Sequence, residues 1–169
     1  ILKTLPTEKS FSSWFAEISN VNHRAWNIVE NTLCQEKAVL SEGQAMKIAI
    51  ASLPEKSIVA LSNSLPVRLI DLFCSGHTAA VDIWCQRGVN GIDGIIAGSC
   101  GASHAQPQAP LLCIIGDVAF AHDLSSLALA QPMGSPRVFL IMDNEGGRIF
   151  EQLPIANHLE KNRHKDNAS

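Results

Sequence analysis

Four short apolar runs between residues 57 and 142 place the strongest constraint on the fold of this chain. Each run is bounded by turn-forming or polar residues, as is typical of β-strands. The runs are SIVAL at 57–61, VDIWC at 81–85, LLCII at 111–115 and RVFLIM at 137–142. The last two are apolar throughout, which predicts strands that are buried on both faces of a sheet.

Segments with helical spacing of apolar residues separate these runs. We expect helices over 67–73, from 92 to about 103, and over 119–130. In the third helix one apolar stripe is expected, formed by Phe120, Leu124, Leu127 and Ala128. The resulting order, β-α-β-α-β-α-β, predicts an α/β fold with an open, mostly parallel sheet that is flanked by helices on both faces.

In such a sheet, ligands bind beyond the carboxyl ends of the strands. A polar residue follows each of the four predicted strands, and we expect all of them to lie along one rim: Asn63, Arg87, Asp117 and Asn144. The neighbour order of the strands cannot be deduced from the sequence.

Two more helices are expected before the first strand. Apolar residues recur every three or four positions from Phe11 to Cys34, which predicts an amphipathic helix packed against a large surface. Ser41 to Gln44 has the spacing of a capping box, so a second helix should begin there and end before Pro54.

Composition narrows the classes of function. The net charge of −3 and the scattered basic residues argue against nucleic-acid binding. No apolar run is long enough to span a membrane, and no export signal is evident. Five widely spaced cysteines without a C-x-x-C pair predict reduced thiols in a cytoplasmic protein. Only 17% of residues are charged, so we expect other protein to cover part of the surface.

The residues at the last two strand ends suggest a metal site. Asp117, Asn144 and the carbonyl of Gly146 are hard oxygen donors of the kind that Mg²⁺ prefers. Gly146 and Gly147 would also let the backbone approach a phosphate closely. The alternative is that Asp117 caps the helix after its strand and that residues 143–147 form a surface turn.

The order Gly-Asp, helix, and buried strand ending in Asn, with Asp117 and Asn144 27 residues apart, resembles the thiamine-diphosphate motif of the 2-oxoacid decarboxylase and acetohydroxyacid synthase superfamily. Four blocks narrow this resemblance to the family of 2-succinyl-5-enolpyruvyl-6-hydroxy-3-cyclohexene-1-carboxylate synthases, here called the menaquinone-pathway synthases. The blocks are SNSLPVRLID at 62–71, RGVNGIDG at 87–94, GDVAFAHDLSSLAL at 116–129 and NEGGRIFEQLP at 144–154.

The resemblance implies an enzyme that uses thiamine diphosphate and Mg²⁺ (or Mn²⁺) to decarboxylate 2-oxoglutarate and add the resulting unit to isochorismate. It implies that the metal is held by Asp117, Asn144 and the carbonyl of Gly146. Ile92 matches the family's apolar wedge under the bent cofactor. The cofactor-binding positions implied are Ser64, Gly91, Ile92, Gly116, Asp117, Val118, Ala119, Asn144, Gly146 and Gly147. The substrate-binding positions implied are Asn63, Arg68, Arg87, Ile149, Phe150 and Leu153.

Arg68 and Arg87 are consistent with substrates that carry carboxylates, because a guanidinium group pairs bidentately with a carboxylate. Other roles remain open for both: Arg68 could pair with Asp71 on its own helix, and Arg87 could be a surface-loop residue. The histidines His77, His104 and His122 share no metal-binding spacing.

The family resemblance also implies a further domain and further sequence that we do not find among these 169 residues. In the superfamily, a Glu from a separate pyrimidine-binding domain, usually of the neighbouring subunit, contacts the cofactor, so we assign no catalytic residue here and expect a homo-oligomer or a partner. The family's domain continues beyond residue 154, which predicts a fold truncated at its C-terminus. We divide the chain into a helical linking segment over 1–36, a diphosphate- and Mg-binding domain over 37–156 and a polar tail over 157–169.

Two alternatives stay open. The chain could be a non-catalytic remnant kept for association, or the corresponding domain of another thiamine-diphosphate enzyme such as an acetohydroxyacid synthase. Those relatives act on smaller monocarboxylates and have less need of two cations at these strand ends.

Overall fold

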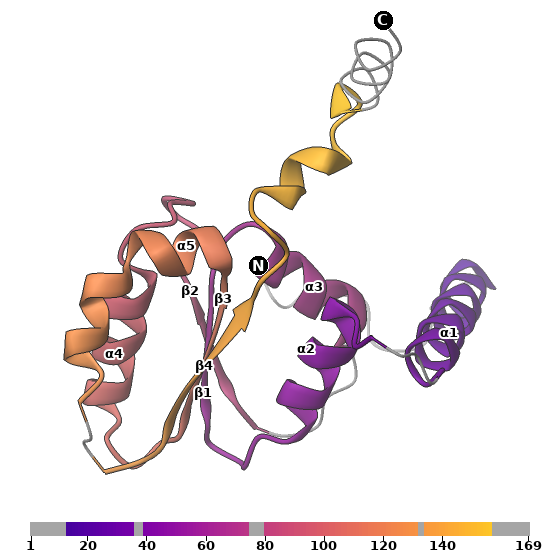
Figure 1. The fold of residues 1–169 in the computed structure, drawn as a ribbon. Coiled ribbons are helices and arrows are strands. Elements are labelled where there is room, and N and C mark those ends of the chain that lie inside the picture. Colours follow the sequence, from indigo (N-terminus) through magenta and orange to yellow (C-terminus); the bar gives the residue numbers. More distant parts are fainter. Residues whose placement is uncertain (1–12, 36–38, 75–79, 132–133, 157–169) are drawn as a thin grey trace, which may run out of the picture.

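A single parallel sheet organises the computed structural model, which describes residues 13–35, 39–74, 80–131 and 134–156. Its strands lie in the order β2-β1-β3-β4, with helices on both faces (Figure 1). Their bounds are Ile58–Leu61 for β1, Asp82–Cys85 for β2, Leu111–Gly116 for β3 and Arg137–Met142 for β4. The α/β fold with a flanked parallel sheet is therefore confirmed, and each predicted strand lies within one residue of its observed bounds.

The strand order reverses between β1 and β3. Leu61 at the end of β1 pairs with Cys85 of β2 on one side and with Ile114 of β3 on the other. The chain thus leaves β1 toward one edge of the sheet and later returns to β1's other side as β3. Such a reversal leaves a crevice outside the carboxyl ends of the two strands, where ligands of α/β sheets bind.

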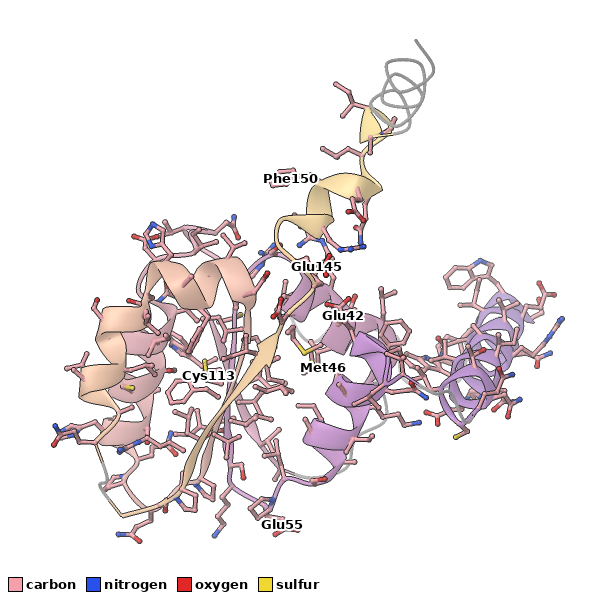
Figure 2. The ribbon with its side chains drawn as sticks, viewed as in Figure 1. Glu42, Met46, Glu55, Cys113, Glu145 and Phe150 are labelled. Atoms are coloured by element: carbon pink, nitrogen blue, oxygen red, sulfur yellow. The ribbon has the colours of Figure 1, made fainter. Side chains whose placement is uncertain are left out.

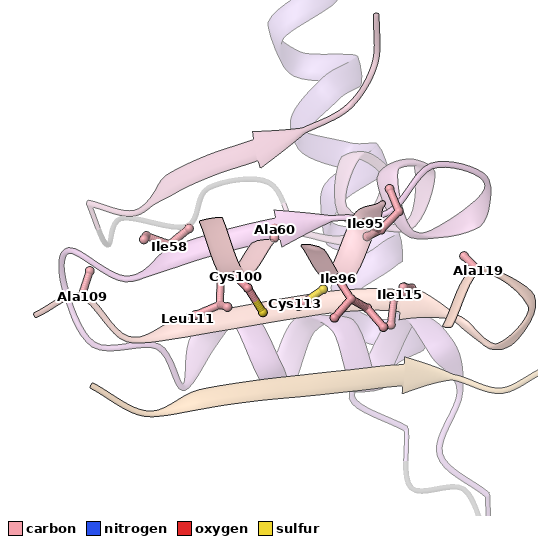
Figure 3. Packing of buried hydrophobic residues seen from close by; sticks show 10 residues of the cluster. All are labelled: Ile58, Ala60, Ile95, Ile96, Cys100, Ala109, Leu111, Cys113, Ile115 and Ala119. Carbon is pink, nitrogen blue, oxygen red and sulfur yellow. The ribbon is translucent and has the colours of Figure 1, made fainter. Parts of the chain in front are cut away.

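The central strands divide their side chains between two cores, because successive residues of a strand point to opposite faces. Ile58 and Ala60 of β1 pack with the cluster under α4 (Ile95–Ala105), which Figure 3 shows in close-up. Val59 and Leu61 pack instead with α2 (Glu42–Ala51) and α3 (Leu65–Phe73). Residues 111–115 of β3 alternate in the same way and are all buried, as predicted.

The same prediction is wrong for β4. Val138 is 54% exposed and Ile141 is 39% exposed, although both belong to an uninterrupted apolar run. The reason is position: β4 is the edge strand of the described sheet, so its apolar residues meet fewer neighbours than those of β3.

The predicted capping box of α2 is present. Ser41 Oγ accepts from the backbone N–H of Gln44, and Gln44 Oε1 accepts from the backbone N–H of Ser41. The helix ends at Ala51, shortly before Pro54. Met46 and Ile50 on its inner face are buried against the sheet, which fixes where the helix begins relative to the strand ends.

The helix predicted over 119–130 is two elements, α5 (Asp117–His122) and the 3-10 helix η2 (Leu124–Leu129). The break lies at the buried Asp123, whose Oδ2 accepts from the backbone N–H groups of Ile96 (2.6 Å) and Ala97 (3.1 Å). The need to place this carboxylate at the start of α4 displaces the chain from α-helical geometry. Leu124 is consequently 51% exposed, so the predicted apolar stripe is wrong at that position.

The N-terminal helix α1 (Ser13–Leu33) forms as predicted, and its packing against a large surface stays a prediction. None of its residues is buried, and Figure 1 shows it to one side of the sheet. Its contacts with α2 include an ion pair between Glu30 and Lys47 and a hydrogen bond from Gln44 Nε2 to Leu33 O (2.8 Å).

All five cysteines are free thiols. Burial raises the pKa of Cys74 and of Cys113 to about 11, so both thiols are protonated near neutral pH. Among the described helices, none is both long and apolar enough to cross a membrane.

Candidate functional site

A pocket of about 750 Å³ lies beyond the carboxyl ends of the strands, at the reversal of strand order. The predicted rim residues Asn63, Arg87, Asp117 and Asn144 all line it. The other predicted site residues that line it are Ser64, Arg68, Ile92, Gly116, Val118, Ala119, Gly147, Ile149, Phe150 and Leu153. The structure thus brings these residues together, while their individual roles remain predictions.

The two predicted residues that do not line the pocket lie beside those that do. Gly91 accepts a hydrogen bond at its carbonyl from Asn63 Nδ2 (2.7 Å). At Gly146, a Cβ would lie 3.8 Å from Asp117 Oδ2 and 3.5 Å from a methyl carbon of Val118. The backbone of Gly146 is therefore a neighbour of the Asp117 carboxylate.

Asp117 begins α5 directly after β3, and its side chain is not used as a helix cap. The N-cap position is Gly116, with no side-chain cap hydrogen bond. Among the described residues, the half-buried Asp117 carboxylate has no hydrogen-bond or ion-pair partner. A carboxylate in a pocket without a partner is suited to a cation, because burial of an unpaired charge is costly.

Asn144 follows β4, and hydrogen bonds hold both its side chain and its backbone. Its Nδ2 donates to Glu42 Oε1 (3.0 Å), and its backbone carbonyl accepts from Arg148 Nε (2.6 Å). The turn itself uses the preceding residue, since Asp143 Oδ1 accepts from the N–H of Glu145 (3.2 Å). Asp143 thus has the surface-turn role, whereas Asn144 faces the pocket.

The loop after Asn144 has three successive residues with left-handed backbone: Glu145 (φ 66°), Gly146 (φ 85°) and Gly147 (φ 64°). Glycine adopts such angles without steric cost, but Glu145 does not. Strained backbone of this kind is concentrated at ligand-binding sites.

The residues present fit a hydrated divalent cation with a phosphate group. Asp117 supplies a carboxylate, Asn144 an amide oxygen and Gly146, a neighbour of the Asp117 carboxylate, a backbone carbonyl. Ser62, which also lines the pocket, has a buried hydroxyl without a partner among the described residues, as expected where a ligand or water completes a site. No cluster of three or more His, Cys, Asp or Glu side chains suited to a metal occurs in the described ranges. The donors named here differ from such a cluster, because only Asp117 is a carboxylate and the others are an amide oxygen and a backbone carbonyl.

Asn63 joins the loops that follow β1 and β2. It is only 3% exposed, and its Nδ2 donates to the carbonyls of Gly91 (2.7 Å) and Gln86 (3.4 Å). Its Oδ1 accepts from Arg87 NH1 (3.1 Å). These bonds hold the 86–91 loop in place, and with it Ile92, which packs against the core cluster under α4.

Arg68 and Arg87 keep their charges unpaired. Arg68 NH1 donates to the carbonyl of Ser64 (2.6 Å), and Arg87 donates to the neutral Asn63. In the described ranges neither forms an ion pair, so the alternative Arg68–Asp71 pair is not made. Ser64 itself has a φ of 72°, a further strained residue at the pocket.

The apolar wall predicted beside the substrate lies on the 3-10 helix η3 (Arg148–Gln152) and just after it. Ile149 is half-buried, but Phe150 is 68% exposed and Leu153 47% exposed. Figure 2 shows Phe150 on the segment that projects beyond the end of β4.

Some lining residues were missed by the sequence analysis: Glu42, Ser62, Leu65, Pro66, Asn90, Met142, Arg148 and Gln152. Most of them lie inside the four sequence blocks that carry the family resemblance or at the end of β4, where adjacency to predicted residues was a usable signal. Glu42 had no such signal, because it lies 102 residues from Asn144 in the chain. His104 and His122 do not line the pocket, and His77 lies outside the described residues.

Comparison with known proteins agrees with this geometry. The family model described as "Thiamine pyrophosphate enzyme, C-terminal TPP binding domain" matches residues 84–168. The chain belongs to the thiamine pyrophosphate enzyme family. Thiamine pyrophosphate is another name for thiamine diphosphate, so the predicted cofactor class is confirmed.

Several curated relatives are 2-succinyl-5-enolpyruvyl-6-hydroxy-3-cyclohexene-1-carboxylate synthases. The one from Shewanella halifaxensis is 34% identical over an alignment 170 residues long, and this alignment covers 90% of this chain and 30% of that protein. The one from Roseiflexus castenholzii is 35% identical over 85% of this chain and 24% of that protein. The one from Sorangium cellulosum is 39% identical over 69% of this chain and 20% of that protein. The predicted resemblance to the menaquinone-pathway synthases is confirmed, and the chain spans less than a third of these relatives' length.

Proposed function

We propose that this chain is the cofactor-binding part of a synthase that decarboxylates 2-oxoglutarate and adds the succinyl-semialdehyde unit to isochorismate, in menaquinone biosynthesis. One observation carries the proposal: a single pocket has the oxygen donors Asp117 and Asn144 on one side and, on the other, Arg68 and Arg87, which form no ion pair with any described residue. The similarity to the menaquinone-pathway synthases supports the choice of substrates.

On the β3–β4 side, Asp117, Asn144 Oδ1 and the Gly146 carbonyl would hold Mg²⁺, or Mn²⁺ in its place. Mg²⁺ keeps further positions for phosphate oxygens and water, so the same ion would fix the cofactor's diphosphate. The remaining proposed cofactor contacts are Ser64, Gly91, Ile92, Gly116, Val118, Ala119 and Gly147. The chemistry that thiamine diphosphate supplies when bound is stabilisation of the carbanion left after loss of CO₂.

On the β1–β2 side, Arg68 and Arg87 would bind substrate carboxylates, with Asn63 nearby to hold Arg87. 2-Oxoglutarate and isochorismate each bring carboxylates, which explains why two cations are kept free of acidic partners. Ile149, Phe150 and Leu153 would cover the reacting region and exclude water from it.

The complete enzyme needs more than this chain. The proposed activating Glu belongs to a pyrimidine-binding domain outside it, supplied within a homo-oligomer, and we expect the chain alone to be inactive as a transferase. We also propose a cytoplasmic location and keep the division at 1–36, 37–156 and 157–169 as a proposal.

The test uses the full-length protein with thiamine diphosphate, Mg²⁺, 2-oxoglutarate and isochorismate. Binding is measured by isothermal titration, and product by mass spectrometry with CO₂ release. We expect cofactor binding and a product that requires both substrates. Preferential turnover of pyruvate would identify another thiamine enzyme, and cofactor binding without turnover of either oxo acid would favour a non-catalytic association domain.

A further inference from the structure

We infer that Glu42 is a positioning residue that turns the carboxamide of Asn144 so that its oxygen, and not its NH₂ group, faces the cation. This inference rests on the proposed function, because it assumes that Asn144 is a metal ligand. It adds a residue that is not among the proposed ligands and that comes from an element far away in the chain.

The contact joins the start of α2 to the end of β4. Glu42 is the first residue of α2, and its Oε1 accepts from Asn144 Nδ2 at 3.0 Å. Both side chains line the pocket. Figure 2 shows Glu42 at the end of α2 that lies beside the carboxyl end of β4, just below Glu145.

The chemistry of the pair allows only one orientation of the amide. An ionised carboxylate accepts hydrogen bonds and cannot donate them, so it attracts Nδ2 and repels Oδ1. The oxygen is thereby left for the pocket. Without such a partner, the two orientations of an amide differ little in shape, and the wrong one would present NH₂ to a cation.

Glu42 is itself held in place by features of α2. The capping box formed by Ser41 and Gln44 fixes the first turn of the helix. Met46, one turn further on, is buried in the same core cluster as Met142, the last residue of β4. The start of the helix and the end of the strand are therefore packed against one cluster beside the 3.0 Å contact.

Another role for Glu42 must be distinguished from this one. An acidic residue in the first turn stabilises a helix through its dipole. That role would affect helix stability but not the affinity for a metal, and loss of the negative charge alone would abolish it. The hydrogen-bonding role, by contrast, is kept in part by a neutral side chain of the same shape that has an acceptor oxygen.

The experiment compares Glu42→Ala and Glu42→Gln in the full-length protein. Mn²⁺ is titrated in the presence of thiamine diphosphate and followed by electron paramagnetic resonance, which reports bound and free ion without any turnover. We expect Glu42→Ala to weaken Mn²⁺ binding by about 10- to 100-fold, as is usual when the partner of a metal ligand is lost. Glu42→Gln can still accept from Asn144 through its amide oxygen, but its NH₂ group can also donate to Asn144 Oδ1, so we expect its loss of Mn²⁺ affinity to be smaller than that of Glu42→Ala but measurable.

Glu55→Ala is the matched control, because it removes the same charge at the opposite end of the sheet (Figure 2). Its Mn²⁺ affinity should be unchanged, and circular dichroism should show that each variant keeps its fold. The inference is overturned if Glu42→Ala binds Mn²⁺ normally, or if Glu42→Gln is as weak as Glu42→Ala; the proposed function survives either result. Failure of the unaltered protein to bind Mn²⁺ with thiamine diphosphate would overturn both.

Discussion

The two sides of the pocket are built differently. On the β1–β2 side, which comprises the loops after β1 and β2, the lining residues hydrogen-bond to one another: Asn63 joins Gly91, Gln86 and Arg87. On the β3–β4 side, which comprises the loops after β3 and β4, the carboxylate of Asp117 has no partner among the described residues, and Asn144 relies on Glu42.

Under the proposed function, this difference would prepare the pocket for ligands of both signs. Arginines can be fixed by neutral oxygens without losing their charge, so the β1–β2 side is organised before an anion arrives. A metal site must instead reserve its oxygens for the ion. The β3–β4 side has a carboxylate without a partner in the described part of the chain and a strained loop, as the proposed cation site would require.

The largest effect on ligand affinity is expected when the carboxylate of Asp117 is removed. Asp117→Ala should weaken binding of Mg²⁺ with thiamine diphosphate by at least about 100-fold, because even the partners of metal ligands are worth 10- to 100-fold. Isothermal titration measures this directly. Asp143→Asn is the control: Asp143 serves the turn, and Asn retains its acceptor oxygen, so affinity should stay near that of the unaltered protein. Equal losses in both variants would mean that the β3–β4 side does not hold the ion through Asp117.

A smaller, substrate-specific effect is expected on the β1–β2 side. Arg87→Ala should raise the KM for 2-oxoglutarate by about 10- to 100-fold, since a hydrogen bond to a charged group contributes about 1.5–3 kcal/mol. Cofactor affinity should hardly change. Arg87→Lys should recover only part of the loss, because Lys lacks the planar fork. Steady-state kinetics with saturating cofactor measures the effect, and a loss of cofactor binding instead would erase the distinction between the two sides.

Organisation of the β1–β2 side before ligand binding can be tested without any ligand. Asn63→Ala leaves the half-buried carbonyl of Gly91 without its donor, so the free energy of unfolding should fall by about 1–3 kcal/mol. Urea denaturation measures it. Ser62→Ala is the matched control on the same buried turn: its hydroxyl has no partner among the described residues, so its removal should be neutral or stabilising. If both variants unfold alike, the Asn63 hydrogen bonds do not organise the loop.

The smallest effect concerns backbone strain. Ser64 has a φ of 72°, which glycine tolerates and serine does not. We expect Ser64→Gly to raise the free energy of unfolding by about 1 kcal/mol, the strain relief less the added entropy of the unfolded chain. Ser64→Ala removes the hydroxyl but keeps the strain, so its urea midpoint should match that of the unaltered protein. A destabilised Ser64→Gly would show that the serine side chain contributes more than its backbone costs.

Much of the site was predictable because parallel strands all end at the same edge of a sheet. Once the β-α alternation was recognised, Asn63, Arg87, Asp117 and Asn144 had to lie on one rim, and the structure places them in one pocket. The strand limits were equally accessible, since apolar runs and turn residues are local signals.

Other features depended on neighbours that local patterns do not specify. The exposure of Val138 depends on β4 being an edge strand, which follows from strand order. The break between α5 and η2 depends on Asp123 serving the start of a different helix. The exposure of α1 likewise shows that helical periodicity predicts a helix but not what it packs against.

Local patterns along the chain were enough to predict the alternation of strands and helices, the polar rim and the family. Contacts across long separations, such as that between Glu42 and Asn144, could be found only in the folded chain. The physical reason is that periodicity and turn chemistry act over a few residues, whereas the packing of α2 on the sheet brings together groups about a hundred residues apart.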